Sequence, residues 1–370
     1  MSARRRAWLG NLALAGASVL VVLLFVELAL RLAGFAPERH LATRRIVDAG
    51  WTRLLDCYPS NPRGYFEIDL RDPETHDRYF GIAPRRFDSI ARWHPWAVES
   101  RYNDLRFRDV PPAPKEAGRY RVVVVGDSFA EGQGVRAEHT VARVIEDRLS
   151  EAQPGRFEVL NCGRRGLDLP ELMEGFGAAL QYEPDLVIYA LVLNDAVRPP
   201  EFQARQTYIN DWILDRERLP DEAVDPPGLL RSRTFDLVAD LIGAWRVGRE
   251  TTRWYLDMWG EGNPRGWERT QALIRDMDRR SNRQGARFLV TIWPLFVGLE
   301  EPYPFASAHE TIGRFCAGAG VPVHDLLPVF RGRRSSKLWV HPVDRHPNED
   351  AHRMAAASLA PVVLRLADAP

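Results

Sequence analysis

RVVVVGDSFAEGQG, residues 121–134, is the stretch that decides the fold. Its four consecutive valines show no polar alternation, which is typical of a strand buried on both faces of a parallel sheet. Gly126, Asp127 and Ser128 follow the valines at once, so the chain turns where the strand ends. The stretch therefore predicts a central strand, a polar turn and the start of a helix.

Four further apolar runs extend this pattern. They are FEVLNC (157–162), DLVIYALV (185–192), ARFLVTI (286–292) and VPVHDL (321–326), and a possible helix or loop follows each of them. Strands that alternate with helices form parallel sheets with helices on both faces. The sequence predicts an α/β fold, a three-layer α/β/α sandwich with a five-stranded parallel sheet, whose functional site lies at the carboxyl ends of the strands.

Ser128 is a candidate nucleophile because of its position. A hydroxyl on a glycine-containing turn between a strand and a helix is exposed above the sheet, near helix N-terminal amides that favour negative charge. Gly-Asp-Ser also forms ordinary turns and helix caps, so the tripeptide alone decides little. The buried strand before it is what favours a catalytic site.

Here the chain resembles a known family. The block VVVVGDSFAEGQG (122–134) looks like the first block of the SGNH (GDSL-like) hydrolases. Later blocks match in chain order: NCGRRG holds Gly166, LVLND holds Asn194, and DRHPN holds Asp344 and His346. Four blocks in the right order make the resemblance specific.

The resemblance implies a serine hydrolase with a triad of Ser128, His346 and Asp344. His346 would be the base that takes the proton of the serine, and Asp344 would orient its imidazole. Gly126 and Asp127 would support the nucleophile from the same block. No cofactor is implied.

The same resemblance implies an oxyanion hole. Its donors would be the backbone N–H groups of Ser128 and Gly166 and the side-chain amide of Asn194, each worth roughly 3 kcal/mol in the transition state. Gly163 competes with Gly166 for this role. Asn194 is also a residue type that forms turns, and Asp195 one that caps helices.

The chain departs from the commonest family pattern at two places. Val192 stands where a glycine often precedes the asparagine, and one residue rather than two separates Asp344 from His346. That shorter spacing resembles extracytoplasmic members that act on polysaccharide acetyl groups. The stretch YNDLRFRD (102–109) resembles a signature of membrane-anchored bacterial members, so the resemblance spans about 103–365.

A metal site is an alternative use of the C-terminal histidines. His341, Asp344, His346 and His352 are all residue types that bind zinc. The serine hydrolase pattern already accounts for two of them. His352 falls on the helix that we expect to begin after its N-cap residue, Asn348, and we expect His352 to pack there. We therefore expect no metal.

The resemblance favours a serine esterase or acyl hydrolase that acts on O-acyl groups of an envelope carbohydrate or lipid. An O-acetyltransferase for an extracytoplasmic polysaccharide shares every step until an acceptor hydroxyl replaces water, so it stays an alternative. A non-catalytic envelope binding module is a second alternative, although such a module needs no nucleophile and base.

Composition excludes some partners. Lys plus Arg and Asp plus Glu both number 50, so no net field attracts nucleic acid. Composition identifies no protein partner. Cys57, Cys162 and Cys316 form neither a CxxC pair nor an even set, which predicts structural cysteines and leaves one bridge open.

The N-terminus predicts a membrane anchor. Arginines at 4–6 precede an uncharged run at 7–26, long enough for a hydrocarbon core of roughly 30 Å. We expect membrane contact through residues 7–30, with Glu27 and Arg31 paired one helical turn apart. The positive-inside rule keeps the N-terminal end in the cytoplasm and the remaining chain outside. Together with the resemblance to membrane-anchored bacterial members, this implies a single-pass protein of the bacterial inner membrane with a periplasmic catalytic domain. A cleaved signal peptide is the alternative.

These observations predict the domain organisation. Residues 1–35 would be the transmembrane anchor, 36–118 an irregular extension packed on the catalytic domain, and 119–370 the hydrolase domain. Within the last, about 199–264 is too long for a plain connection and contains several tryptophans, which predicts an inserted helical cap.

Overall fold

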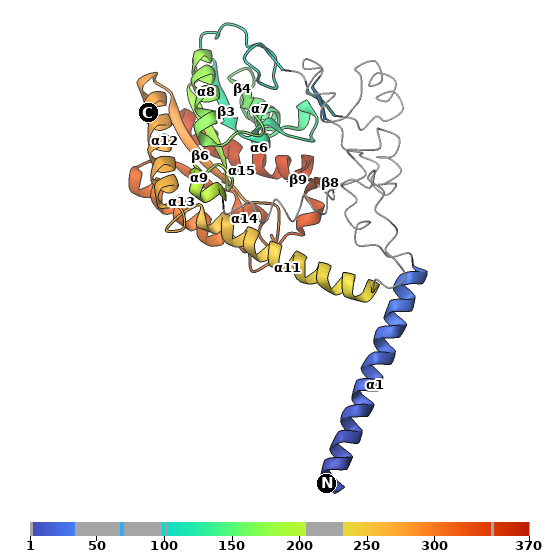
Figure 1. The fold of residues 1–370 in the computed structure, drawn as a ribbon. Helices are drawn as coiled ribbons and strands as arrows, with labels where there is room; N and C mark the ends of the chain where they lie inside the picture. Colours follow the sequence, from blue (N-terminus) through green and yellow to red (C-terminus); the bar gives the residue numbers. More distant parts are fainter. Residues whose placement is uncertain are drawn as a thin grey trace. The chain divides into compact units, whose positions relative to one another are not determined.

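The structure, a computed structural model, describes residues 3–33, 67–69, 98–100, 102–204, 232–341 and 344–369 (Figure 1). They fall into two compact units. Residues 3–33 and 232–251 belong to the first unit, and the other described residues belong to the second.

A five-stranded parallel sheet forms the centre of the second unit. Its order is β4-β3-β5-β6-β7, with β3 at Tyr120–Gly126, β4 at Phe157–Gly163, β5 at Leu186–Val192, β6 at Arg287–Trp293 and β7 at Val323–Asp325. The four valines of β3 are at most 4% exposed, because β3 lies between β4 and β5 under helices on both faces. The predicted parallel sheet is confirmed, although β7 is shorter than the apolar run at 321–326.

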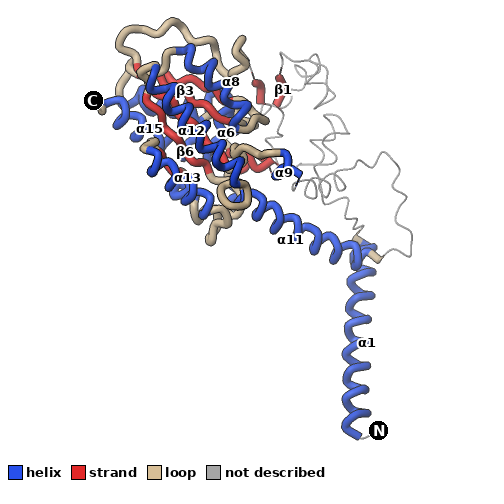
Figure 2. Tube along the Cα trace, turned by 60° about the vertical axis from the view of Figure 1, so that its left-hand side comes forward, coloured by secondary structure: helices blue, strands red, loops and turns tan. Residues whose placement is uncertain are grey.

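Helices cover both faces of this sheet. The chain passes from β3 to β4 through α7 (Val141–Ala152) and then reverses direction, through α8 (Leu169–Ala179), α12 (Pro264–Arg283) and α13 (Ala306–Ala319). Because parallel crossovers are right-handed, this reversal puts α7 on the face opposite the other three. The C-terminal α15 (Glu349–Asp368) packs beside α7. The predicted three-layer sandwich is confirmed (Figures 1 and 2).

Short elements complete the second unit. They are α6 (Ser128–Glu131), η2 (Ala137–His139), η3 (Leu180–Tyr182), α9 (Pro200–Gln203), α14 (Leu327–Phe330), η5 (Ser335–Lys337), and the strands β1 (Glu67–Asp69) and β2 (Val98–Ser100), which pair in parallel. No helix or strand forms in residues 102–118. Cys162 and Cys316 are buried free thiols, while Cys57 lies outside the described residues.

An antiparallel pair of strands precedes α15. β8 (Trp339–His341) and β9 (Asp344–Pro347) pair in an irregular register, with His341 opposite Asp344. Asn348 then caps α15, since its side chain accepts a hydrogen bond from the Ala351 N–H. This confirms the predicted N-cap. β9 contacts α6, so the pair brings this part of the chain to the turn that follows β3.

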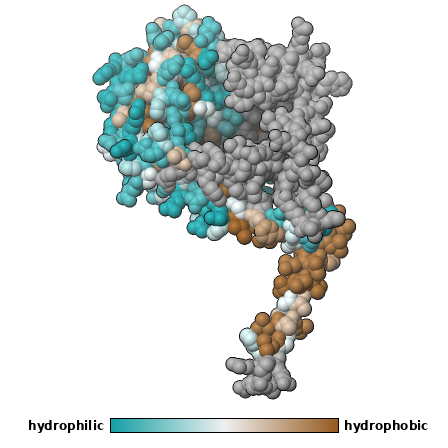
Figure 3. Space-filling model, in the orientation of Figure 1, coloured by the Kyte–Doolittle hydropathy of each residue, from teal (hydrophilic) through white to brown (hydrophobic). Residues whose placement is uncertain are grey.

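The first unit contains α1 (Ala3–Leu32) and most of α11 (Arg233–Asp257). The segment Trp8–Leu32 has a mean hydropathy of 2.5 and is long and apolar enough to cross a membrane. Figure 3 shows the apolar surface along α1. The predicted pair of Glu27 and Arg31 forms, with 2.7 Å between Oε1 and Nε.

Candidate active site

The turn after β3 is built by close packing around Gly126. A Cβ at this position would lie 2.7 Å from the Ala190 carbonyl oxygen of the neighbouring strand β5, so only glycine fits. Asp127 then caps α6 by accepting a hydrogen bond from the Phe129 N–H at 2.9 Å. Ser128 is the first residue of α6 and is 8% exposed, and its N–H has no acceptor within the helix.

His346 faces the Ser128 hydroxyl. Its Nε2 atom lies 2.8 Å from Ser128 Oγ, which is hydrogen-bond distance. The imidazole also packs edge-on against Phe129, with 5.5 Å between ring centroids, and Phe129 in turn contacts Trp293. The ring is thus held from one side by an aromatic cluster. The backbone of Asp344 lies on β9 beside His346, but its side chain lies outside the described part of the chain.

Asp127 connects the serine with Asn194. Asn194 Nδ2 donates to Asp127 Oδ2 at 3.1 Å, and the Ser128 hydroxyl lies 3.4 Å from the same oxygen. Burial raises the pKa of Asp127, while the Phe129 N–H, the Asn194 amide and His346 oppose that rise. The arrangement holds the Asn194 amide beside Ser128.

The side chain of Asp195 stabilises the turn that carries Asn194. Asp195 caps no helix; its Oδ2 accepts hydrogen bonds from the Tyr189 hydroxyl at 2.7 Å and from the Val192 N–H at 3.1 Å. Asp195 is fully buried, and burial together with neighbouring Asp127 raises the pKa of its carboxyl well above the usual range. A rigid, buried polar group therefore fixes the end of β5.

The geometry distinguishes Gly163 from Gly166. The Gly163 N–H already donates to Asn161 Oδ1 at 3.0 Å, and a Cβ there would lie 2.2 Å from the Glu131 nitrogen. Gly166 has a positive φ of 76°, open space around it, and an N–H that donates to none of the described residues. Gly163 thus serves close packing, whereas Gly166 keeps a donor available.

Glu131 supports the loop that carries Gly166, and the sequence pattern gave it no role. It is 1% exposed, and its carboxylate accepts from the Tyr102 hydroxyl at 2.6 Å and from the Arg165 N–H at 2.7 Å. The Arg165 guanidinium lies 3.6 Å from the same carboxylate and donates to Tyr102. α6 and the loop after β4 are therefore joined through one buried carboxylate.

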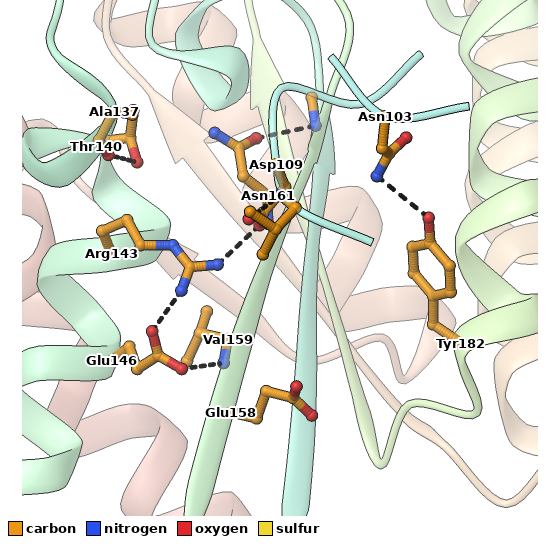
Figure 4. Close-up of polar contacts among 12 residues, drawn as sticks. Asn103, Asp109, Ala137, Thr140, Arg143, Glu146, Glu158, Val159, Asn161 and Tyr182 are labelled. Carbon is orange, nitrogen blue, oxygen red and sulfur yellow. Dashed lines mark hydrogen bonds and ion pairs between the residues drawn. The ribbon is translucent and has the colours of Figure 1, made fainter. Parts of the chain in front are cut away.

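The segment from Tyr102 to Asp109 braces the same region. The Arg108 guanidinium donates to the carbonyl oxygens of Gly132 at 2.6 Å and Val135 at 2.7 Å, which fixes the loop after α6. Asp109 Oδ2 accepts from the Arg143 side chain and from the Asn161 N–H, both at 2.7 Å (Figure 4). The signature seen in the sequence is therefore a structural support for the turn of the serine.

Asn103, in the same segment, also has a structural role. Its side-chain oxygen accepts from the Leu105 and Phe107 N–H groups, and its amide lies 3.3 Å from the Tyr182 hydroxyl (Figure 4). These bonds shape the segment without reaching Ser128. The identity of Asn103 is explained by this turn.

His352 takes no part in the site. It is fully buried, its Nδ1 accepts from the Val141 N–H at 3.1 Å, and burial lowers its pKa to about 3. The imidazole is neutral at physiological pH and ties α7 to α15, which agrees with the expected packing role. Of the other zinc-ligand candidates, His346 faces Ser128, and the side chains of His341 and Asp344 lie outside the described residues.

Comparison with known proteins gives one family match. The model of the GDSL-like lipase/acylhydrolase family matches residues 124–354, more than half of the chain. No curated protein matches the sequence.

Solved structures resemble the chain more distantly. An acetylxylan esterase from Geobacillus stearothermophilus is 13% identical, with a TM-score of 0.41 over 70% of this chain and 98% of that one. The esterase EstA from Pseudoalteromonas sp. is 14% identical, with a TM-score of 0.37 over 67% and 99%. A GDSL-like lipase from Bacteroides thetaiotaomicron is 12% identical, with a TM-score of 0.36 over 69% and 92%.

Proposed function

Because the chain belongs to the GDSL-like lipase/acylhydrolase family, we propose that it is a serine esterase whose nucleophile is Ser128 and whose base is His346. The separation of 2.8 Å between Ser128 Oγ and His346 Nε2 is the observation that carries the proposal. A hydroxyl and an imidazole at that distance can exchange the proton that makes the serine nucleophilic.

In the first step, Ser128 Oγ attacks the carbonyl carbon of the ester while its proton moves to His346 Nε2. The carbonyl oxygen becomes an oxyanion, which the N–H groups of Ser128 and Gly166 and the amide of Asn194 stabilise. His346 then returns the proton to the leaving alcohol, and an acyl-enzyme remains. Water, activated by the same imidazole, releases the acid and restores the serine.

Two carboxylates assist this step in different ways. Asp344 orients His346 and stabilises the imidazolium from its other ring nitrogen, as the family pattern implies. Asp127 holds the Asn194 amide at 3.1 Å next to the serine and gives it up to the oxyanion when charge develops there. One carboxylate therefore acts on the base and the other on an oxyanion donor.

We further propose that α1 anchors the enzyme in the bacterial inner membrane, with the catalytic domain in the periplasm. The uncharged run and the arginines at 4–6 support this orientation. An enzyme held there meets the O-acyl groups of envelope carbohydrate or lipid, which we propose as its substrate class.

Two assays on the full-length protein in detergent test the catalytic proposal: hydrolysis of a chromogenic acetyl ester and labelling by a fluorophosphonate probe. Ser128→Ala is expected to abolish both labelling and hydrolysis. Ser358→Ala is the matched control, because Ser358 Oγ, within α15, also lies 2.8 Å from a histidine nitrogen, that of His324 on β7. Labelling that survives Ser128→Ala, or is lost with Ser358→Ala, would contradict the assignment.

A further inference from the structure

One face of α11 is apolar and exposed. Its exposed large apolar side chains, at 47–72% of their full surface, are Phe235, Val238, Leu241, Ile242 and Trp245. At 100° per residue these five positions fall within an arc of about 120° on the helix. A continuous apolar stripe of this kind is unusual on a surface that faces water and marks an interaction site.

The start of this helix is attached to α1. The Glu27 carboxylate accepts hydrogen bonds from the Arg233 N–H at 2.9 Å, the Thr234 N–H at 2.8 Å and the Ser232 hydroxyl at 3.0 Å. A carboxylate at a helix N-terminus satisfies amides that have no partner within the helix. Glu27 therefore caps α11, although the two segments are far apart in the sequence.

The cap determines the depth of α11 relative to the anchor. Residues 8–27 of α1 span about 30 Å at helical rise, which is roughly the thickness of the hydrocarbon core. Glu27 then lies at the outer edge of that core, where its charge is satisfied by α11 and by Arg31. The stripe on α11 begins two residues after Arg233, at the level of the lipid headgroups.

The charges that follow the stripe favour an anionic surface. Arg246 and Arg249 are exposed and fall on or beside the same arc, and the Arg249 guanidinium lies 4.8 Å above the Trp245 ring. Tryptophan is enriched at membrane interfaces, and arginine pairs with anionic headgroups. The helix thus presents apolar side chains first and basic side chains next. Figure 3 shows apolar surface on both α1 and this part of α11.

We propose that residues 233–249 of α11 form an interfacial amphipathic helix, which lies on the outer face of the same anionic membrane that α1 crosses. The inference rests on the proposed anchor and not on the proposed chemistry. An amphipathic helix of this kind buries its apolar stripe at the boundary between headgroups and acyl chains. The enzyme would then have a second membrane contact beside its transmembrane helix.

Depth-dependent quenching in vesicles tests this placement. The full-length Cys57→Ser protein retains two described cysteines, Cys162 and Cys316, which are buried. An environment-sensitive fluorophore is attached in Leu241→Cys, in Glu250→Cys on another face of the helix, and in Val22→Cys within α1. The vesicles contain phosphatidylcholine with brominated acyl chains, with or without phosphatidylglycerol.

We expect the probe at position 241 to be quenched about threefold more strongly than the probe at position 250, and more so with phosphatidylglycerol. Equal quenching at 241 and 250, together with strong quenching at 22, overturns the inference and leaves the anchor intact. Lack of quenching at position 22 overturns both the proposed anchor and the proposed interfacial helix. Ester hydrolysis measured in the same vesicles reports on the catalytic proposal independently.

Discussion

Substitution of Glu131→Gln tests whether a buried carboxylate positions the loop that carries Gly166, a donor of the proposed oxyanion hole. Glu131 accepts two short hydrogen bonds, from Tyr102 and from the Arg165 N–H, and lies 3.6 Å from the Arg165 guanidinium. Glutamine retains one acceptor oxygen and places an NH₂ group against a donor. Since a hydrogen bond to a buried charge contributes about 1.5–3 kcal/mol, we expect a loss of about 2 kcal/mol in the free energy of unfolding.

This loss has two measurable consequences. For a domain of this size, about 2 kcal/mol lowers Tm by roughly 4–8 °C. Because one oxyanion donor is worth roughly 10²–10³ in kcat, a partial displacement of the Gly166 loop should lower kcat about tenfold and leave KM unchanged.

Differential scanning fluorimetry and ester hydrolysis measure the two effects. Glu174→Gln is the control, because Glu174 is 87% exposed and lies 3.8 Å from Arg164 of the same loop. That variant should match the unmodified protein in both assays. If Glu131→Gln retained full kcat despite a lower Tm, the carboxylate would stabilise the fold without positioning the loop. If neither changed, Glu131 would contribute neither to stability nor to the position of the loop.

Two further predictions concern glycine positions and pH. Gly163→Ala should lower the free energy of unfolding by several kcal/mol, because the new Cβ would lie 2.2 Å from the Glu131 nitrogen. Gly166→Ala should lower it by only about 1–2 kcal/mol, because the cost there comes from the positive φ alone. Urea unfolding measures both losses, and equal losses would contradict this difference. The folded-state pKa of His352, about 3, lies below the ordinary 6.5, so the unfolded chain binds more protons and stability falls as pH drops from 6.5 towards 3. His352→Asn retains an acceptor for the Val141 N–H but does not titrate. The difference in free energy of unfolding between the unmodified protein and this variant should therefore shrink by about 2 kcal/mol between pH 8 and pH 5. A difference that stays constant with pH would refute the linkage.

The central sheet could be predicted because its signal is local. Four valines in β3 and the uninterrupted apolar run of β5 have no amphipathic alternation, and short runs of this kind rich in β-branched residues are typical of strands covered on both faces. Ser128 could be proposed from its place directly after such a strand. His346 could be proposed only through the resemblance to the hydrolase family, because 218 residues separate it from the serine.

Other parts of the site leave no local pattern. Glu131 meets Arg165 across 34 residues and Tyr102 across 29, and a glutamate in a short polar turn looks the same whether it is buried or exposed. β8 and β9 are only three and four residues long and mostly polar, so the sequence pattern predicted no strand there. The roles of such residues follow from tertiary packing and were visible only in the folded chain.

The bond between Glu27 and Thr234 has a consequence for biosynthesis. A ribosome adds about 5–20 residues per second, so roughly 10–40 s pass between synthesis of Glu27 and synthesis of its partner 207 residues later. If α1 is the proposed anchor, it enters the membrane during this interval with Arg31 as the neighbour of Glu27 along the helix. The proposed anchor would then gain the hydrogen bonds at its outer end only from a later segment, and a chain that stops before Ser232 would leave the Glu27 carboxylate without them.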